Sequence, residues 1–121
     1  MEVLEAKKYK EEPSTGLKSV NKIDLEPWTN RQYNDALKAC NVFGIEFKEL
    51  FREPWRAAPK PDIRTVITQM LSERHGLKDR PISDHLKINR STVLYHKKRF
   101  ERLFKVDKEF RSKCLILNVE P

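Results

Sequence analysis

The segment from Ile82 to Val93 constrains the fold of this chain more than any other. Its apolar residues have the spacing of a short helix, a tight turn and the start of a second helix. Ile82 and Leu86 lie one helical turn apart. Ile88 falls in the turn, and Val93 begins the apolar face of the next helix. This spacing predicts a helix-turn-helix, a motif whose second helix presents its first residues to DNA base edges.

The remaining pattern predicts an all-α protein, a small helical bundle, because no segment shows the alternation typical of a strand. Thr29 and Gln32 have the spacing of a capping box, and Gly44 suits the end of the helix that follows. We expect Asp62 to cap an amphipathic helix that Gly76 ends. Further helices are expected at residues 45–51, from near Pro81, from Asn89 to near Phe104, and from Asp107 to near Leu117.

Charge is distributed unevenly along the 121 residues, a length that supports one domain. The net charge is +7, and residues 62–121 carry 14 Lys and Arg against 8 Asp and Glu. Residues 1–61 carry 11 basic against 10 acidic side chains. A basic half beside a nearly neutral half indicates a module that binds a polyanion, with an attachment. The alternative is a basic surface without a partner.

Three segments are expected along the chain. Residues 1–25 are mostly charged and polar, which predicts a flexible N-terminal arm. Residues 26–58 are predicted to form accessory helices, either an interaction module for a protein partner or homodimer, or a cap on the small core. The proline-containing stretch 56–61 is typical of a linker, and it leads into a helix-turn-helix domain at 59–121.

The chain lacks the usual residue patterns of enzymes and metal proteins. Cys40 and Cys114 lie far apart in apolar helical patterns, which favours buried free thiols over a disulfide. The three histidines have no cysteine partners at zinc-ligand spacing, and His96 flanks the predicted core. Three glycines in total allow no phosphate-binding glycine loop, and no isolated acid pair stands out. We therefore expect no enzyme, no metal and no cofactor.

No apolar run approaches the ~18 residues that a membrane span needs. The first residues also lack the apolar core of a signal peptide. We expect a cytoplasmic, nucleoid-associated protein without membrane contact, or a component of a virion if its role is structural.

The helix that begins near Asn89 has two distinct faces at about 100° per residue. Val93 and Phe100 face the core, and Lys97 interrupts this face with a stem that can pack while its ammonium reaches solvent. We expect Asn89 to cap the helix and Arg90 to pair with guanine. The candidates for DNA contact are Lys78, Arg80, Asn89, Arg90, Ser91, Thr92, Tyr95, Lys98, Arg99 and Arg102.

A family resemblance begins at Ser91. Ser91-Thr92-Val93 is followed by the basic run Lys97-Lys98-Arg99 and then by Asp107. This order resembles the C-terminal DNA-binding domain of the bacterial replication initiator DnaA, over residues 62–117. The resemblance implies a DnaA-like or Trp-repressor-like helix-turn-helix that binds double-stranded DNA, as a stand-alone module without the initiator's ATPase domain.

The chain also departs from this family. The base-reading Asp-His pair of the family is Asn89-Arg90 here, and the turn before it is one residue shorter. The minor-groove arginine has no clear counterpart among its neighbours Arg74, Lys78 and Arg80. We expect a small regulator or replication-associated factor of a mobile or viral genome. The alternative is a structural or scaffolding protein that uses the same fold for protein contacts or non-specific nucleic-acid contact.

Overall fold

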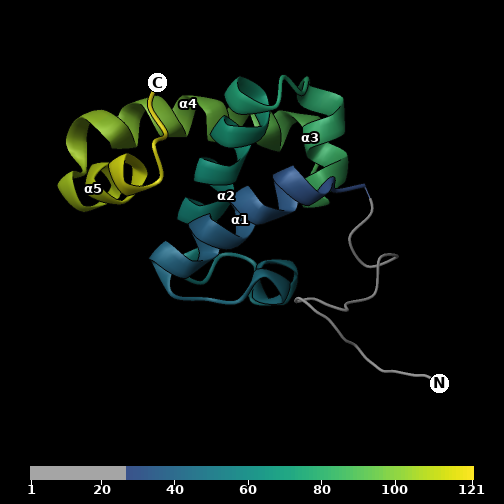
Figure 1. Cartoon of the computed structure of the whole chain (residues 1–121), viewed down its shortest axis with the longest axis horizontal. Coiled ribbons are helices and arrows are strands. Elements are labelled where there is room, and N and C mark those ends of the chain that lie inside the picture. The colour runs from purple at the N-terminus through teal and green to yellow at the C-terminus, as the bar shows by residue number, and fades with distance from the viewer. Residues whose placement is uncertain (1–26) are drawn as a thin grey trace.

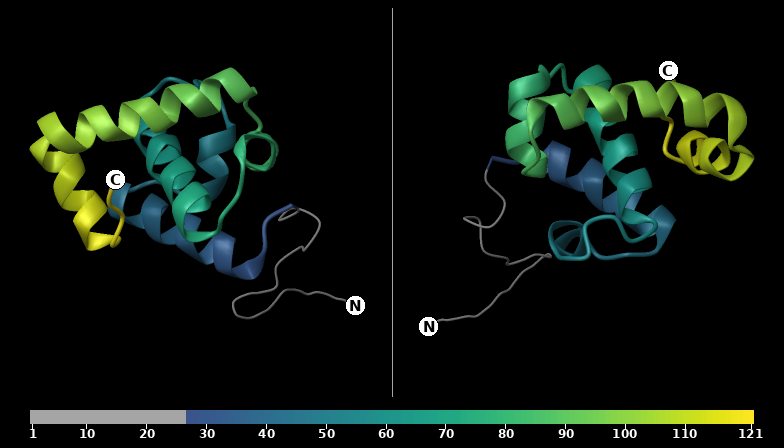
Figure 2. Two further views of the ribbon diagram at one scale, coloured as in Figure 1. Left: turned by 90° about the horizontal axis from the view of Figure 1, so that it is seen from above. Right: turned by 180° about the vertical axis from the view of Figure 1, so that it is seen from behind.

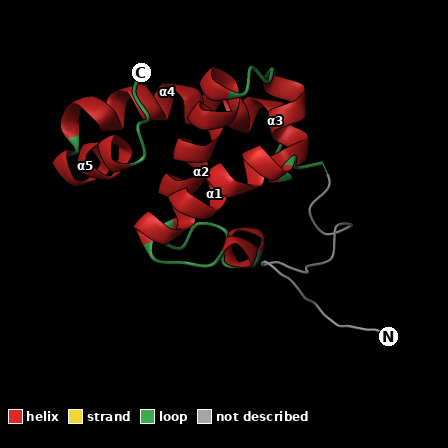
Figure 3. Cartoon of the chain, viewed as in Figure 1, coloured by secondary structure: helices red, strands yellow, loops and turns green. Residues whose placement is uncertain are grey.

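The computed structural model describes residues 27–121, and over this range the chain is helical without any strand (Figures 1 and 3). The elements are α1 (Asn30–Phe43), η2 (Phe47–Phe51), α2 (Lys60–Gln69), η3 (Met70–Arg74), α3 (Asp79–Leu86), α4 (Arg90–Val106) and α5 (Lys108–Ile116). Element η2 is a 3-10 helix, and η3 is a π-helical turn that continues α2. The all-α prediction is confirmed for the described part of the chain. The arm predicted at residues 1–25 lies outside it.

Caps define the starts of three helices as the sequence predicted. Thr29 Oγ1 accepts from the backbone N–H of Gln32 at 3.2 Å, and Gln32 Oε1 accepts from the N–H of Thr29 at 3.0 Å. Asn89 caps α4, and Asp107 caps α5. Gly44 ends α1 with a φ of +86°, a left-handed conformation that glycine adopts without strain.

The start of α2 differs from the expectation that Asp62 caps it. The helix begins at Lys60, and no side chain caps its first turn. Pro61 fits there because a first-turn residue needs no N–H partner within the helix. Asp62 instead pairs with Arg99 of α4, with Oδ1 2.7 Å from Nη2. Its carboxylate links two helices and caps neither.

One hydrophobic core lies around α2, which continues into η3 and is buried from Ile63 to Leu71. Figure 2 shows α4 crossing above α2 and α1 lying on the opposite side of α2. Helix α5 folds back at one end of α4. Ala36 and Cys40 of α1 and Leu50 of η2 belong to the same cluster as the apolar residues of α2, α3 and α4. The helices within residues 26–58 therefore complete the core of residues 59–121, and the stretch 56–61 does not separate two cores.

Both cysteines are buried free thiols, as the sequence predicted. Cys40 lies on the inner side of α1, and Cys114 lies on the inner side of α5. Burial raises the pKa of each thiol to about 12, and the charge of Asp62 adds to the effect at Cys114. Both side chains are therefore uncharged packing residues at neutral pH.

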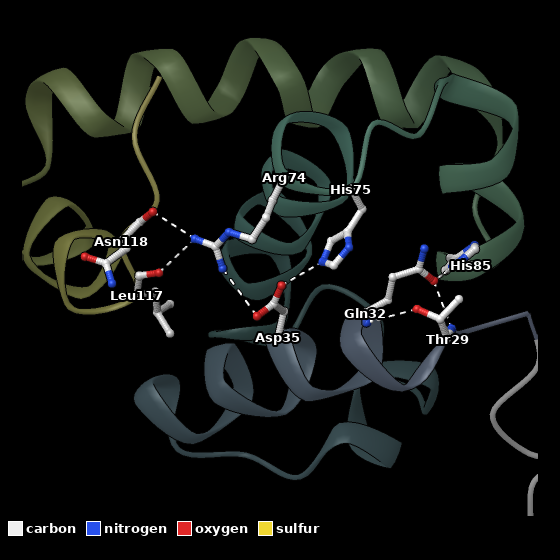
Figure 4. Close-up of polar contacts among 8 residues, drawn as sticks. All are labelled: Thr29, Gln32, Asp35, Arg74, His75, His85, Leu117 and Asn118. Carbon is white, nitrogen blue, oxygen red and sulfur yellow. Dashed lines mark hydrogen bonds and ion pairs between the residues drawn. The ribbon is translucent and has the colours of Figure 1, made fainter.

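Asp35 on α1 links α1 to the end of η3 (Figure 4). Its carboxylate oxygens lie 2.7 Å from His75 Nε2 and 3.3 Å from Arg74 Nη1. Arg74 Nη2 also donates to the carbonyl oxygens of Leu117 and Asn118, at 3.1 and 2.8 Å. One arginine thus joins α1, η3 and the chain that follows α5.

His85 provides a second link to α1, at Gln32, which lies about one turn before Asp35 on the same helix (Figure 4). Its Nε2 lies 2.8 Å from Gln32 Oε1, and its Nδ1 lies 2.8 Å from the carbonyl oxygen of Pro81. The ring of Trp28 packs edge-on against it, with centroids 4.8 Å apart. These contacts attach α3 to the capping box that begins α1.

Helices α2 and α4 share a buried polar contact. Thr65 Oγ1 lies 2.8 Å from His96 Nδ1 and accepts from Arg99 Nη1 at 2.9 Å. Burial, aided by the positive charges of Arg99 and Arg64, lowers the pKa of His96 to about 4. Because His96 is only 3 % exposed, its ring packs between the helices as a neutral group.

The pKa of His96 predicts that the fold loses stability in mild acid. An unfolded histidine binds a proton near pH 6.5, whereas His96 in the fold resists protonation down to a pH of about 4. The free energy of unfolding should therefore be highest above pH 6.5 and should fall by roughly 3 kcal/mol as the pH drops to 4. Urea unfolding followed by circular dichroism across this range measures the loss.

His96→Gln is the matching variant, because an amide keeps a polar partner for Thr65 but does not titrate. Its unfolding free energy should vary less with pH than that of the wild type. Burial also lowers the pKa of His85, which accounts for a remaining slope. Ring resonances of His96 that titrate near pH 6.5 in the folded wild type would contradict the prediction.

The shared core predicts that residues 59–121 do not fold alone. Removing residues 1–58 takes away Ala36, Cys40 and Leu50, and it uncovers the apolar side chains of α2 that they touch. Thermal unfolding of this fragment should show no cooperative transition, whereas the full chain should show one. A fragment that melts cooperatively at the temperature of the full chain would mean that the first helices are dispensable for folding.

Candidate functional site

Helices α3 and α4 are joined by a tight turn, Lys87-Ile88-Asn89. Lys87 ends α3 in the left-handed conformation with a φ of 58°, and Ile88 packs against the core. The N–H of Ile88 donates to the carbonyl oxygen of Ser83 at 3.1 Å. The apolar residue in the turn and this hydrogen bond hold the start of α4 in a defined position relative to α3.

Asn89 organises the first turn of α4. Its Oδ1 accepts from the N–H of Thr92 at 2.8 Å, from the hydroxyl of Ser91 at 2.7 Å and from the hydroxyl of Thr92 at 2.8 Å. The predicted capping role of Asn89 is confirmed. Because both hydroxyl protons point at the cap, the oxygen of the exposed Ser91 presents only acceptor lone pairs to solvent. Thr92 is half-buried.

The outward face of α4 combines cations with large exposed side chains. Tyr95 is 54 % exposed and Leu94 is 48 % exposed. No acidic residue lies in the first turn of α4, and the first carboxylate along the helix is Glu101. The exposed residues before and beside Glu101 are Arg90, Ser91, Leu94, Tyr95, Lys98 and Arg102. A ligand at the N-terminal half of this face therefore meets no negative side chain on α4 itself.

Three of the predicted cations come together at the start of α3. Lys78, Arg80 and Arg90 line one open cavity of about 640 Å³. Asp79 lines it too, but its carboxylate pairs with Lys97 of α4, with the oxygen 2.6 Å from Nζ. The ammonium of Lys97, expected to reach solvent, is thus engaged between the two helices. Within residues 27–121, Lys78, Arg80 and Arg90 form no ion pair with a carboxylate.

Arg99 does not belong to the outward face, contrary to the prediction from helical spacing. Its Nη2 lies 2.7 Å from Asp62 Oδ1, its Nη1 donates to Thr65, and its side chain is only 17 % exposed. Turning Arg99 outward would leave the half-buried Asp62 without its partner. The guanidinium therefore joins α2 to α4, and we remove Arg99 from the candidate contacts.

A second cavity, of about 710 Å³, lies between α4 and the segment that precedes α2. Thr92, Tyr95 and Arg99 from the predicted set line it. The lining also includes an aromatic ring and cations that the sequence did not point to, namely Trp55, Arg56, Arg64 and Lys87. The neighbours Trp55 and Arg56 carried a signal, an aromatic ring beside a cation, but their distance along the chain from Tyr95 concealed the shared cavity.

Two further properties of residues 27–121 bear on function. No group of three or more His, Cys, Asp and Glu side chains in this range is arranged to hold a metal ion. No helix there combines the length and the apolar character needed to cross a bilayer. In comparisons with known proteins, no family model, no curated protein and no solved structure matches the chain.

Proposed function

We propose that this protein binds duplex DNA with the exposed face of α4, as a small regulator or replication-associated factor. The observation that carries the proposal is the exposed face of α4 from Arg90 to Lys98, which presents cationic, hydroxyl and phenol groups together with Leu94 and no carboxylate. In a helix-turn-helix formed by α3, the turn and α4, the first residues of α4 enter the major groove, and α3 crosses the DNA backbone. The resemblance to the DnaA C-terminal domain supports the same proposal.

Arg90 is the residue that we assign to base recognition. It is exposed at the first position of α4, and a guanidinium can donate two hydrogen bonds to O6 and N7 of guanine. Leu94, one turn farther on, offers an apolar surface to a thymine methyl group. Ser91 accepts from a base amine, because its own proton is directed at Asn89.

The cations around this centre are assigned to phosphates. Lys78 and Arg80 lie at the start of α3, and Lys98 and Arg102 lie farther along α4. Contacts to phosphate position a protein on DNA without reading the sequence, and they release counterions. Affinity should therefore fall steeply as salt is raised, and base preference should depend on the few residues at the start of α4.

Arg90→Ala and Lys98→Ala should have different effects on duplex binding. Arg90→Ala removes the base contact, so preference at one base pair should relax by ~1–3 kcal/mol. Lys98→Ala removes a phosphate contact, so all duplexes should bind more weakly and the slope of log affinity against log salt should decrease by about 1. Fluorescence anisotropy with a panel of single-base variants measures both. Equal loss of affinity on every duplex for Arg90→Ala would contradict its role as a base reader.

Ser91→Glu tests whether the start of α4 faces DNA. A carboxylate in the first turn is favourable for the helix itself, because it lies near the positive end of the helix dipole. The variant should therefore keep its fold but bind duplexes about tenfold or more weakly, since the new charge would face phosphates and base edges. Ser112→Glu is the matched control, because Ser112 is exposed on α5 and the change in net charge is the same.

The test is completed by selecting bound duplexes from a random pool. The selection is carried out with the wild type and with both variants. An enriched sequence motif that is lost in Ser91→Glu and kept in Ser112→Glu supports the proposal. Binding without enrichment that neither variant changes would favour the structural or scaffolding alternative. No binding to any duplex at low salt would refute DNA binding altogether.

A further inference from the structure

The cavity beside α4 contains two features that duplex binding by α4 does not use. Trp55, in the segment before α2, is 38 % exposed although it is one of the largest apolar side chains. Arg56 follows it and is also exposed. Both side chains line the cavity of about 710 Å³, and this volume lies within the roughly 300–1,000 Å³ of typical ligand pockets.

The ring of Trp55 contacts a buried arginine. The guanidinium carbon of Arg64 lies 5.4 Å from the ring centroid. Arg64 is itself buried, and its Nη2 donates to the carbonyl oxygen of Leu50 at 3.2 Å. Arg64 therefore supports one face of the indole, and Trp55, which is partly exposed, lines the cavity.

The rest of the lining favours an anion that also carries an aromatic ring. Tyr95 supplies a second exposed ring, and the exposed Arg56 and Lys87 supply positive charge. Among the described residues that line the cavity there is no Asp or Glu. His96, also in the lining, is kept neutral by its burial. Cations alone would suit an acidic peptide, whereas an aromatic platform with cations beside it suits a base joined to a phosphate.

We propose that this cavity binds an unpaired nucleotide, with its base stacked on Trp55 and its phosphate on Arg56 and Lys87. The nucleotide comes either from a single strand of DNA or RNA or from a free mononucleotide, which present the same chemistry. Trp55 and Arg56 lie outside α3 and α4. The site therefore adds residues that duplex binding by α4 does not use, and it shares Thr92 and Tyr95 of α4 with the duplex-binding face.

The first test uses the full chain and a fluorescein-labelled oligothymidylate. Trp55→Ala should weaken binding by about five- to 150-fold, the range expected when one stacked base loses its platform. Trp55→Phe, which keeps an aromatic face, should bind within a few-fold of the wild type. A random duplex measured in parallel should bind to Trp55→Ala with unchanged affinity. Unchanged oligothymidylate binding by Trp55→Ala would overturn the proposal whether or not the duplex binds.

Two arginine variants that remove the same charge, and the fluorescence of Trp55, provide a second test. Arg56→Ala should weaken oligothymidylate binding more than Arg52→Ala, which removes the same charge from a residue that does not line the cavity and pairs with Glu49. Thymidine monophosphate should quench the exposed Trp55, and Trp55→Phe should abolish the quenching, because Trp28 is buried. Equal effects of the two arginine variants would overturn the proposal.

The source of the nucleotide follows from the same titrations. Saturable quenching by thymidine monophosphate that the oligothymidylate competes away supports a site for a single nucleotide. Binding of the oligothymidylate alone supports a site for a strand. If neither probe binds, or if only an oligoglutamate peptide binds in a manner that requires Arg56, the cavity is not a nucleotide site.

Discussion

The burial of α2 on every side is the constraint on which the other elements depend. A helix in that position can hide its apolar stripe easily, but its polar side chains require partners inside the protein. Arg64 donates to Leu50 O, Thr65 meets His96, and Gln69 donates to the carbonyl oxygen of Glu120 at 3.0 Å. These partners come from η2, α4 and the end of the chain. These three side chains therefore find their hydrogen-bond partners only when distant parts of the chain assemble, whereas the buried Thr68 Oγ1 on the same helix has no partner among the described residues.

The same packing decides what remains on the surface of α4. Lys97, Lys98 and Arg99 are consecutive cations, but each has a different environment. Lys97 pairs with an aspartate of α3, and Arg99 pairs with an aspartate of α2. Lys98 is exposed, with no carboxylate within ion-pair distance in residues 27–121. A charged run in the sequence therefore contributes to the surface only where no opposite charge lies across the helix interface.

Local signals predicted much of the fold, because each of them involves residues within one helical turn. The capping box at Thr29, the caps at Asn89 and Asp107, and the glycine that ends α1 all belong to this kind. The apolar stripe that runs from α2 into η3 likewise predicted the apolar residues that are buried there, but it did not predict the burial of the polar residues of α2. None of these signals depends on how the helices are arranged.

The predictions that were wrong or missing concern contacts between residues that are far apart in the sequence. The sequence predicted Asp62 as a helix cap and Arg99 as a surface cation. Both predictions were wrong because the two residues pair with each other between α2 and α4, and local spacing gives no signal of a contact between helices. Trp55 and Tyr95 share a cavity although they are far apart in the chain, so no local pattern could reveal it. The residues of a surface define the chemical class of its ligand, but they do not by themselves identify the ligand. Duplex binding by α4 thus stays a proposal.

Capping α4 limits the hydrogen bonds that Asn89 itself can form with a ligand. Asn89 normally offers both a donor and an acceptor, but here its oxygen already receives three hydrogen bonds from Ser91 and Thr92. Only its amide nitrogen is left to face a ligand. Asn89 can therefore approach a phosphate oxygen or a purine N7 but not a base amine, so the two-sided pairing of asparagine with adenine is closed to it.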